Sequence, residues 1–485
     1  MLEERVINHS LPWAPAHDTG ERARGLEELL TVYSPFGAIR NVLTSFRSSV
    51  GPYGFQGSAT PMSLDHQLRR MLGMSGISAG LDRDIYGGGK GLTFADSVAS
   101  SLGEAVERML GSFSSLQTVD SKDRITASAT EMRTAGLKHV SPNEYDSYSE
   151  EQLDTPGFLF ERWTEDTRLV WHRGQNLLTN EDHWVPAQFV HLFYISSPEE
   201  VRVGSSSSGG LSTHVSKDHS LAHGLLEVVE RDGLNVAWFS KIPLSIVDID
   251  TDFKDPLIDE WLESARRVGL DINFYVHRMD MPDFFVVTAT GIEQGLSSGM
   301  YVSGGGVGLR LEDAIRSALA EVVQAERMTR SAQLTPDWEL TMGVEKRFGI
   351  KPDATTTDFT NFIQVIDYYG YPQNQSKLDW FFKNPDMERI KLSENQPPKS
   401  QTSALSDILD LYEKYGLTPI AFDLTPSDFH RIKTTKVFVP ELAPAFPPNN
   451  PQLGHRRYRE VPRKLGLIDR PWTFEDMPTD PLPYP

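Results

Sequence analysis

Three segments of the chain place acidic or amide side chains three residues apart, a spacing that could hold a metal ion. The pairs are Glu104 with Glu107, Glu227 with Glu230, and Glu321 with Gln324. Side chains at this spacing are neighbours on a helix surface. Carboxylate oxygens suit Mg²⁺, which bridges carboxylates to phosphates. The copies are unequally spaced, which argues against a solenoid. We therefore expect the same acid-bearing helix to occur three times in one fold.

The residues around each pair favour a helix. At about 100° per residue, apolar residues gather along one side of each segment, with the acids beside that stripe or roughly opposite it. The stripes are Val98, Leu102, Val106 and Met109; Leu221, Leu225, Val228 and Val229; and Ile315, Leu319, Val322 and Val323.

A solvated acidic face is the alternative interpretation, and for a single Glu pair it is the more common one. Two features argue against it. No Lys or Arg occurs from Phe94 to Glu107, and the other positions of these helices are mostly Ala, Ser, Gly and Val. Such helices are buried nearly all round, and buried carboxylates require partners because an unpaired buried charge is costly.

A Gly- or Ser-rich stretch precedes each pair, at residues 87–91, 205–210 and 303–308. Glycine lets the backbone approach a ligand or another chain segment closely, and the start of the following helix favours anions. No Walker A motif is present, because Lys90 is followed by Gly91, and other nucleotide-binding fingerprints are missing too. A nucleotide would therefore bind through carboxylates, magnesium and isolated basic residues.

Composition excludes several classes of function. The 485 residues carry a formal charge of −20, which disfavours non-specific binding to nucleic acid or anionic membrane. There is no cysteine, which excludes disulfides, thiolate zinc sites, iron–sulfur clusters and a Cys nucleophile. No signal peptide or membrane-spanning apolar run is recognisable, so we expect a soluble cytoplasmic protein that binds neither nucleic acid nor membrane.

The remaining chain predicts strands among further helices, which indicates an α/β or α+β protein. Strands are expected at residues 157–160, 189–193, 244–247, 284–287 and 418–422, and a helix at 405–415. Residues 1–60 are expected to be loop and short strands, with turns at Gly51-Pro52 and Gly54. The last five residues read Pro481-Leu-Pro-Tyr-Pro485. This run is either a frayed polyproline II terminus, a ligand for a proline-binding domain, or a stiff arm that delivers a terminal carboxylate to a fixed place.

Taken together, these segments resemble the blocks of the YcaO family, in the same order and from about residue 30 onward. The matching blocks are Gly89-Lys90-Gly91-Leu92-Thr93 running into Ser100, Glu104, Glu107 and Arg108; Leu225-Leu-Glu227-Val-Val-Glu230-Arg231-Asp232; Ala318-Leu-Ala-Glu321-Val-Val-Gln324; Asp423-Leu-Thr425; Val439-Pro-Glu-Leu442; and Leu453-Gly454 with Arg456 and Arg457.

The resemblance implies an α+β fold in which β-sheets pack with long helices that bear the ExxE pairs around a nucleotide site. It assigns residues 61–485 to a YcaO-like catalytic domain that ends in a Pro-rich PxPxP tail. Residues 1–60 would form an N-terminal region for partner docking.

The resemblance also implies an enzyme that uses ATP and Mg²⁺ to act on a peptide amide. A nucleophile attacks the amide carbonyl, ATP phosphorylates the resulting oxygen, and phosphate leaves. The PxPxP end is similar to that of the azoline-forming branch, in which a Cys, Ser or Thr of a ribosomally synthesised precursor peptide is the nucleophile. We therefore expect a cyclodehydratase that makes thiazoline or oxazoline.

By the same resemblance each candidate residue has a role. The acids would hold magnesium, Lys90, Arg108 and Arg231 would contact phosphate or brace the acids, and Pro485 would supply a terminal carboxylate acting as a base. Ser100, Ser212 and Gln324 would make polar contacts with the nucleotide. The metal ligands would be Glu104, Glu107, Glu227, Glu230 and Glu321.

Two positions depart from the family pattern, one in the second copy and one in the third. The pattern Ser-x-x-Asn-x-x-x-Glu, counted from Ser212, falls on Val215 and His219. One Mg²⁺ ligand is then missing, unless His219 or Asp218 compensates. In the third copy the expected Arg is one residue late, at Arg327.

The partners follow from the resemblance as well. No adenylating half with zinc-binding CxxC pairs is present, so we expect a separate, ThiF-like partner that binds the leader of the precursor peptide. We also expect a homodimer and a flavin dehydrogenase acting downstream. The alternatives are a YcaO-type thioamide or amidine synthase with the same ATP site, and a non-catalytic docking subunit of the synthetase complex.

Overall fold

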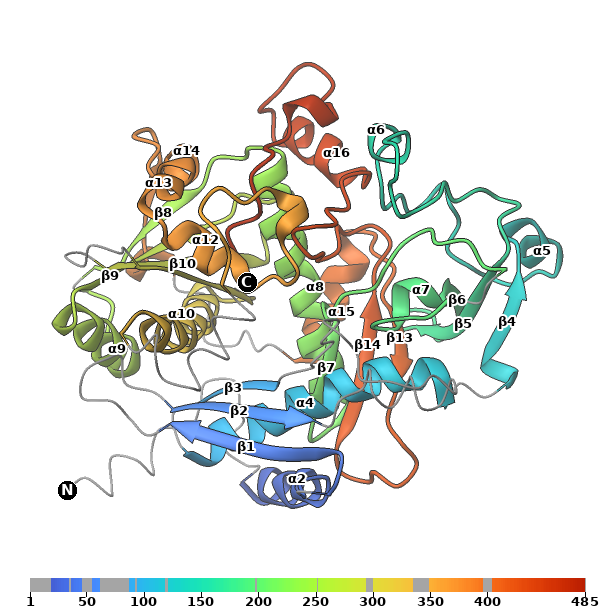
Figure 1. Ribbon diagram of the computed structural model, residues 1–485, viewed down its shortest axis with the longest axis horizontal. Coiled ribbons are helices and arrows are strands. Elements are labelled where there is room, and N and C mark those ends of the chain that lie inside the picture. Colours follow the sequence, from blue (N-terminus) through green and yellow to red (C-terminus); the bar gives the residue numbers. More distant parts are fainter. Residues whose placement is uncertain are drawn as a thin grey trace.

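The computed structural model describes residues 19–34, 36–45, 55–61, 87–91, 94–117, 121–196, 199–250, 252–293, 300–334, 349–395 and 404–484. These residues form three β-sheets with three long helices packed against them (Figure 1). The fold class is α+β, as predicted. Three positions named in the sequence predictions, the Gly51-Pro52 turn, Gly54 and Pro485, lie outside the described residues.

The first sheet is antiparallel, with strand order β1-β2-β3. Its strands are β1 (Ile39–Ser45), β2 (Phe55–Pro61) and β3 (Gly87–Gly91), and its helices are α2 (Thr19–Thr31) and α4 (Phe94–Gln117). Helix α2 lies where loop and short strands were expected. The Glu28 carboxylate accepts hydrogen bonds from the backbone N–H groups of His430, Arg431 and Ile432, which joins α2 to a distant loop and lowers the pKa of Glu28.

The second sheet has strand order β11-β10-β9-β8-β12. Its strands are β8 (Ser245–Asp248), β9 (Leu270–Val276), β10 (Phe285–Glu293), β11 (Met300–Gly308) and β12 (Glu388–Lys391). Its main helices are α9 (Pro256–Arg267) and α10 (Leu311–Leu334). The strands predicted at 244–247 and 284–287 are β8 and the start of β10. Helix α9 begins after Asp255, whose carboxylate accepts the N–H groups of Leu257 and Ile258.

The third sheet has strand order β4-β5-β13-β14-β7, and β6 pairs with β5. Its strands are β4 (Arg124–Ala127), β5 (Leu169–Asn176), β6 (Asp182–Pro186), β7 (Leu211–His214), β13 (Ile420–Asp423) and β14 (Lys433–Phe438). Helix α8 (Lys217–Phe239) follows β7, and α15 (Leu405–Lys414) packs against α8. The helix predicted at 405–415 and the strand predicted at 418–422 are α15 and β13.

Short helices complete the fold. They are α5 (Ala129–Thr134), α6 (Glu150–Leu153), α7 (Ala187–Val190), α12 (Gln364–Gly370), α13 (Pro372–Gln375), α14 (Asp379–Phe382), α16 (Arg457–Lys464), and the 3₁₀ turns η1 (Ser121–Asp123), η2 (Thr356–Asp358), η3 (Ser376–Leu378), η4 (Ser393–Asn395) and η5 (Phe474–Asp476).

Two strand predictions are wrong. Residues 157–160 form no strand; Phe158 and Phe160 instead lie against Tyr148, with ring centroids 5.0 and 4.6 Å from it. Residues 189–193 begin in helix α7, where Phe189 and Val190 are buried. Four or five apolar residues do not distinguish a strand from a buried turn of helix, because the environment on each side decides between them.

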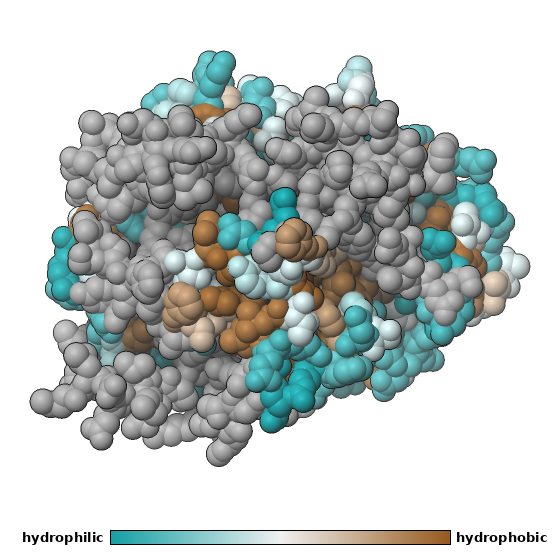
Figure 2. All heavy atoms as spheres, turned by 60° about the horizontal axis from the view of Figure 1, so that its bottom comes forward, coloured by the Kyte–Doolittle hydropathy of each residue, from teal (hydrophilic) through white to brown (hydrophobic). Residues whose placement is uncertain are grey.

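Helix α8 occupies the centre of the molecule, and most of the buried apolar residues belong to the cluster around it and α10 (Figure 1). The predicted stripe residues of α8 and α10 are all buried, whereas Val98 and Met109 of α4 are only half-buried. Seen from the side of α2 and β1, apolar residues gather in the middle of the described surface (Figure 2). The exposed apolar side chains of α2, β1 and the turn between them include Leu30, Phe36 and Leu43.

Candidate nucleotide and metal site

Each of the three acidic helices follows a strand at the edge of its own sheet. Strand β3 leads into α4, β7 into α8, and β11 into α10, and each strand ends one of the three sheet orders. Each helix also contacts the strand of another copy: α4 contacts β7, α8 contacts β11, and α10 contacts β3. The three copies therefore form a closed ring, which brings the acids of distant segments together.

The described side chains of the pairs also connect one copy to the next around this ring. In each pair, the residue three positions after the first acid reaches the next strand in the ring. Glu107 Oε2 accepts the N–H of Thr213 on β7 (3.1 Å). A Cβ on Gly305 of β11 would lie 2.8 Å from Glu230 Oε1, and one on Gly88 of β3 would lie 2.6 Å from Gln324 Nε2. Glycine at these positions is what allows the approach.

The first acid of two pairs binds a backbone amide of its own copy. Glu227 Oε2 accepts the N–H of Gly210 (3.0 Å), just before β7, and Glu321 Oε2 accepts the N–H of Gly305 on β11 (2.8 Å). Backbone amides hold a carboxylate in its charged form through hydrogen bonds. The Gly- and Ser-rich stretches thus donate N–H groups to the acids that follow them in the sequence.

Basic side chains pair with the same acids. Arg108 donates to Glu104 (3.2 Å) and Lys90 to Glu321 (2.9 Å), while the Arg231 guanidinium lies 3.7 Å from Glu227 and 3.5 Å from Glu230. Arg108 and Arg231 stand four residues after the first Glu of their pairs. The absence of Lys and Arg from Phe94 to Glu107 therefore did not leave Glu104 without an i+4 partner.

Burial and neighbouring charges shift the pKa values of the acids in different directions. Burial raises the pKa of Glu104, raises that of Glu107 well above its usual range, and together with nearby Glu321 and Glu227 raises that of Glu230 to about 7. Burial also acts on Glu321, but Lys90, Arg231 and the Gly305 amide outweigh it and lower the pKa. Acids held this way gain from a divalent cation, which replaces the missing solvation.

Acidic and basic groups occur in the site in similar numbers. Five carboxylates face four basic groups, the fourth being Lys436 of β14, which sequence reasoning missed. No three acidic or histidine side chains of the described residues already converge as a metal site, because the acids are bound to bases and amides. If phosphate and a divalent cation bound together, Lys90, Arg108 and Arg231 would pair with the phosphate and the acids with the cation, so the donor set fits both.

The ammonium of Lys436 is buried, and burial lowers its pKa to about 8 against the opposing effect of Glu227. The strand predicted at 418–422 ends before this residue, and nothing in its local pattern marks it. Its only sequence clue is that it lies four residues before Pro440, which belongs to a block that resembles the family.

The other predicted residues lie on the same elements. Ser100 is one turn before Glu104 on α4, and half-buried. Ser212 is buried on β7, and its carbonyl accepts a hydrogen bond from Ser220. Arg327 lies on α10, and its side chain is outside the described residues, as is Pro485.

The two positions that depart from the family pattern have other partners. Val215 packs against α2, where a Cβ on Gly25 would lie 2.3 Å from its Cγ1. His219 lies in the first turn of α8, with Nδ1 2.8 Å from Ser216 Oγ and its ring 4.8 Å from that of His214. No hydrogen bond joins His219 to a repeat acid in the part of the chain that the structure describes.

The Pro-rich tail runs from α16 back into the middle of the molecule (Figure 1). Its carbonyls accept buried donors: Trp238 to Asp480 (3.2 Å), Tyr369 to Pro481 (2.5 Å), and both Tyr301 and Ser303 to Pro483 (2.9 and 2.7 Å). Tyr301, Ser303 and Gly305 lie on one face of β11, because alternate strand residues share a face. The tail therefore lies on the face that meets Glu230.

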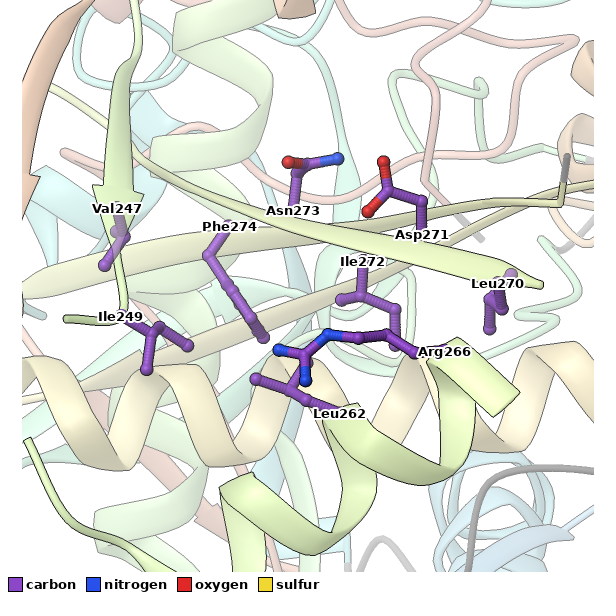
Figure 3. Close-up of a pocket in the computed structure, with 9 residues that line it drawn as sticks. All are labelled: Val247, Ile249, Leu262, Arg266, Leu270, Asp271, Ile272, Asn273 and Phe274. Carbon is purple, nitrogen blue, oxygen red and sulfur yellow. The ribbon is translucent and has the colours of Figure 1, made fainter. Parts of the chain in front are cut away.

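A separate cavity of about 180 Å³ lies between α9 and strands β8 and β9 (Figure 3). Arg266 and Leu262 of α9 line it with Ile272 and Phe274 of β9, whereas none of the repeat acids does. It is distinct from the ring of acids. Among the described residues, no helix is both long and apolar enough to cross a membrane.

Comparison with known sequences gives one family. Residues 88–443 match the YcaO family, described as YcaO cyclodehydratase, ATP- and Mg²⁺-binding. An uncharacterized protein of Methanothermobacter thermautotrophicus is 26% identical over 243 residues, which are 50% of this chain and 57% of the relative.

Comparison with solved structures gives the same fold. A heterocyclase in complex with substrate and cofactor aligns with a TM-score of 0.75 and 19% identity, over 98% of this chain and 59% of that one. The YcaO protein of Methanopyrus kandleri, bound with AMPPCP and Mg²⁺, aligns with a TM-score of 0.55 and 18% identity over 87% of this chain and 89% of that one. A chain of the E. coli microcin synthetase McbBCD complex aligns at 0.53 and 14% over 83% and 88%. This chain spans under two thirds of the first heterocyclase and of the curated relative.

Proposed function

Because the chain belongs to the YcaO family, we propose that it is an ATP- and Mg²⁺-dependent cyclodehydratase that forms azolines in a ribosomally synthesised precursor peptide. The observation that carries this proposal is the ring of five acids and four basic groups drawn from three sheet edges. Such a site suits phosphoryl transfer, in which positioning and charge neutralisation supply most of the catalysis.

The reaction that we propose has three steps. A Cys, Ser or Thr side chain adds to the carbonyl carbon of the preceding amide and gives up its S–H or O–H proton. The former carbonyl oxygen then attacks the γ-phosphorus of ATP, and the bond to ADP breaks. Finally the C–O bond breaks, phosphate leaves with that oxygen, and loss of the amide N–H proton leaves a C=N bond in the ring.

Each group in the ring has a proposed role. Glu104, Glu107, Glu227, Glu230 and Glu321 hold magnesium, and Lys90, Arg108 and Arg231 move from these acids to phosphate when ATP binds. Ser100, Ser212 and Gln324 make polar contacts with the nucleotide. Magnesium supplies positive charge that offsets charge on the transferring phosphoryl group.

The described part of the tail is held by the hydrogen bonds that Tyr369 of α12 donates to Pro481 and that Tyr301 and Ser303 of β11 donate to Pro483. A Pro485 carboxylate acting as base stays a prediction. Tyr301→Phe combined with Ser303→Ala removes both donors to Pro483, so we expect azoline formation to fall more than AMPPCP binding. Equal losses of both would contradict a role of the tail in cyclisation.

The proposed function also includes partner proteins. The acidic chain works with a ThiF-like partner that binds the leader of the precursor peptide, and a flavin dehydrogenase acts on the azoline. A homodimer is the expected assembly. The microcin synthetase neighbour is itself a complex of several proteins, which supports a multi-protein assembly without identifying its members here.

Intact-mass spectrometry of the precursor peptide tests the function. The peptide is incubated with this protein, the leader-binding partner, ATP and Mg²⁺. We expect the loss of one water per modified Cys, Ser or Thr, absent without ATP and absent with Glu230→Gln. The matched control is Glu263→Gln on the exposed face of α9. A gain of sulfur in place of oxygen would instead indicate the thioamide reaction, and an unchanged mass with an active partner would contradict both.

One observation favours a second candidate, a non-catalytic docking subunit. Val215 and His219 stand where the family pattern has Asn and Glu, and both have partners outside the acid ring. If this reading holds, the wild-type chain hydrolyses no ATP with partner and substrate present, and Val215→Asn with His219→Glu strengthens Mg²⁺·AMPPCP binding. Turnover by the wild-type chain excludes it.

A further inference from the structure

Lys436 is a buried cation whose side chain contacts the loop that precedes the second acid pair. Its Nζ donates to the carbonyl oxygens of Ser207 (2.7 Å) and Gly209 (2.6 Å). The side chain is almost fully buried, at 3% exposure. Glu227, Arg108 and Glu107 are the charged groups that act on it. A buried ammonium with two carbonyl acceptors is a costly arrangement that a Met of similar shape would avoid.

The peptide group between Gly209 and Gly210 connects this ammonium to Glu227. Its carbonyl oxygen accepts from Lys436, and its N–H donates to Glu227 Oε2 (3.0 Å). In a trans peptide the C=O and N–H point in opposite directions, so one peptide spans the gap between a cation and an anion. A positive charge at the oxygen polarises the peptide and strengthens the hydrogen bond that its N–H makes.

The next peptide is held by the same strand. The Gly210 carbonyl accepts the N–H of Val437 (2.7 Å), and Gly210 itself has a φ of +79°, which favours glycine. The other oxygen of Glu227 lies 3.7 Å from Arg231. The carboxylate is therefore held between the Arg231 guanidinium and the amide of the loop, and the Lys436 ammonium acts on that amide from the other side of the peptide.

We propose that Lys436 is a positioning residue for Glu227: through the Gly209–Gly210 peptide it holds that carboxylate in place for the metal ion. The inference rests on the proposed function, because Glu227 is a metal ligand only within it. Outer groups that orient a metal ligand typically change metal affinity 10- to 100-fold when removed. We expect Lys436→Met to weaken Mg²⁺ binding about tenfold at saturating AMPPCP.

The test is a calorimetric Mg²⁺ titration of the full chain with AMPPCP present. Lys436→Arg keeps the charge and two donors, so we expect it to recover most of the affinity. Lys433→Met is the matched control: Lys433 lies on the opposite face of β14 and its Nζ donates to the Phe429 carbonyl (3.4 Å). Glu227→Gln alone and combined with Lys436→Met complete a double-mutant cycle, in which Lys436→Met should cause little further loss.

Several outcomes would overturn the inference. These are a Mg²⁺ affinity of Lys436→Met within twofold of the wild type, an Arg variant as weak as the Met variant, or an undiminished loss in the Glu227→Gln background. If Lys436→Met does not fold, as judged by thermal unfolding, Lys436→Gln is measured against the same criteria. Failure of the wild-type chain to bind Mg²⁺·AMPPCP would instead contradict the proposed function.

Discussion

At the residue scale, the acids of the ring are held by partners that a ligand would have to replace. Lys90, Arg108 and Arg231 each lie within 4 Å of a repeat acid. A second group of charges is buried without any role in the ring. Arg457 of α16 donates to Asp232 of α8 and to Asp280, and Asp232 is completely buried. This network ties a late segment of the chain to the helix that carries Glu230.

Replacing Asp232 by Asn tests that network. The change leaves the buried Arg457 guanidinium short of its closest negative partner, so we expect the free energy of unfolding to fall by about 3–5 kcal/mol. Urea unfolding at neutral pH measures it. The control is Glu460→Gln, which removes an exposed pair with Lys464 and should cost under about 1 kcal/mol. Similar small losses for both variants would mean that the buried pair is not a net constraint.

His277 gives the fold a dependence on pH. It is buried, with Nε2 2.7 Å from Thr288 Oγ1, and burial lowers its pKa to about 3. In the unfolded chain a histidine titrates near pH 6.5. As the pH falls from about 6.5 towards 3, the unfolded state binds a proton that the folded state does not, so stability falls by about 1.4 kcal/mol per pH unit.

The His277→Gln variant removes this contribution. Between pH 7 and pH 5 the wild type should lose about 2 kcal/mol more of its unfolding free energy than the variant does. Urea unfolding at the two pH values measures the difference, with His223→Gln on the exposed side of α8 as control. An equal loss in wild type and His277→Gln would show that other groups carry the acid sensitivity.

At the element scale, alternating glycines let two strands pack directly on the backbone of the helix that follows. A Cβ on Gly87 or Gly89 would lie 2.2 or 2.1 Å from atoms of Ser101 on α4, and one on Gly306 would lie 2.1 Å from the Ala314 carbonyl of α10. The intervening Gly88 and Gly305 face the acids instead. The glycine-rich stretches thus serve helix packing on one face and the site on the other.

Gly306→Ala tests the packing role. Its added methyl group meets helix backbone, which cannot rotate away, so we expect a loss of about 1–3 kcal/mol in unfolding free energy. Gly103→Ala on α4 is the control, because a Cβ there meets nothing within 4 Å. That change should stabilise the helix by about 0.5–1 kcal/mol. Two variants of equal stability would contradict the close approach of β11 and α10.

At the scale of the whole molecule, three sheets meet at one edge each, and the three helices close the ring between them. Segments as far apart as Lys90 and Glu321, 231 residues in sequence, make one ion pair. A nucleotide and cation that bound these acids as proposed would contact all three copies, so their binding would be linked to global stability.

Thermal unfolding with AMPPCP and Mg²⁺ tests this linkage. Because acids and bases neutralise each other in the absence of ligand, we expect the two together to raise Tm well above the sum of their separate effects. At 100 times Kd a ligand that binds only the folded state adds about 2.7 kcal/mol. The Glu321→Gln variant should lose this gain. An additive response would mean that nucleotide and cation bind independently.

Local spacing determined much of the protein. The acid pairs, their apolar stripes and the glycine stretches predict α4, α8 and α10, because the period of a helix is fixed by backbone geometry. The order of these segments and of the later blocks predicted the family, and the family match over residues 88–443 confirms it. The division at residues 60 and 61 stays a prediction, although β2 pairs with β3 across it.

Only the tertiary structure decided which groups meet. The ring order and the pairing of Lys90 with Glu321 join residues from different sheets. The peptide that connects Lys436 to Glu227 joins residues of one sheet and its helix that lie far apart in the sequence. Such contacts leave no periodic signal in sequence, because they depend on how edge strands are brought together by burial of the shared core. The strand predictions at 157–160 and 189–193 were wrong for the same reason. Packing against neighbouring segments, rather than the alternation of their own residues, decided their conformation.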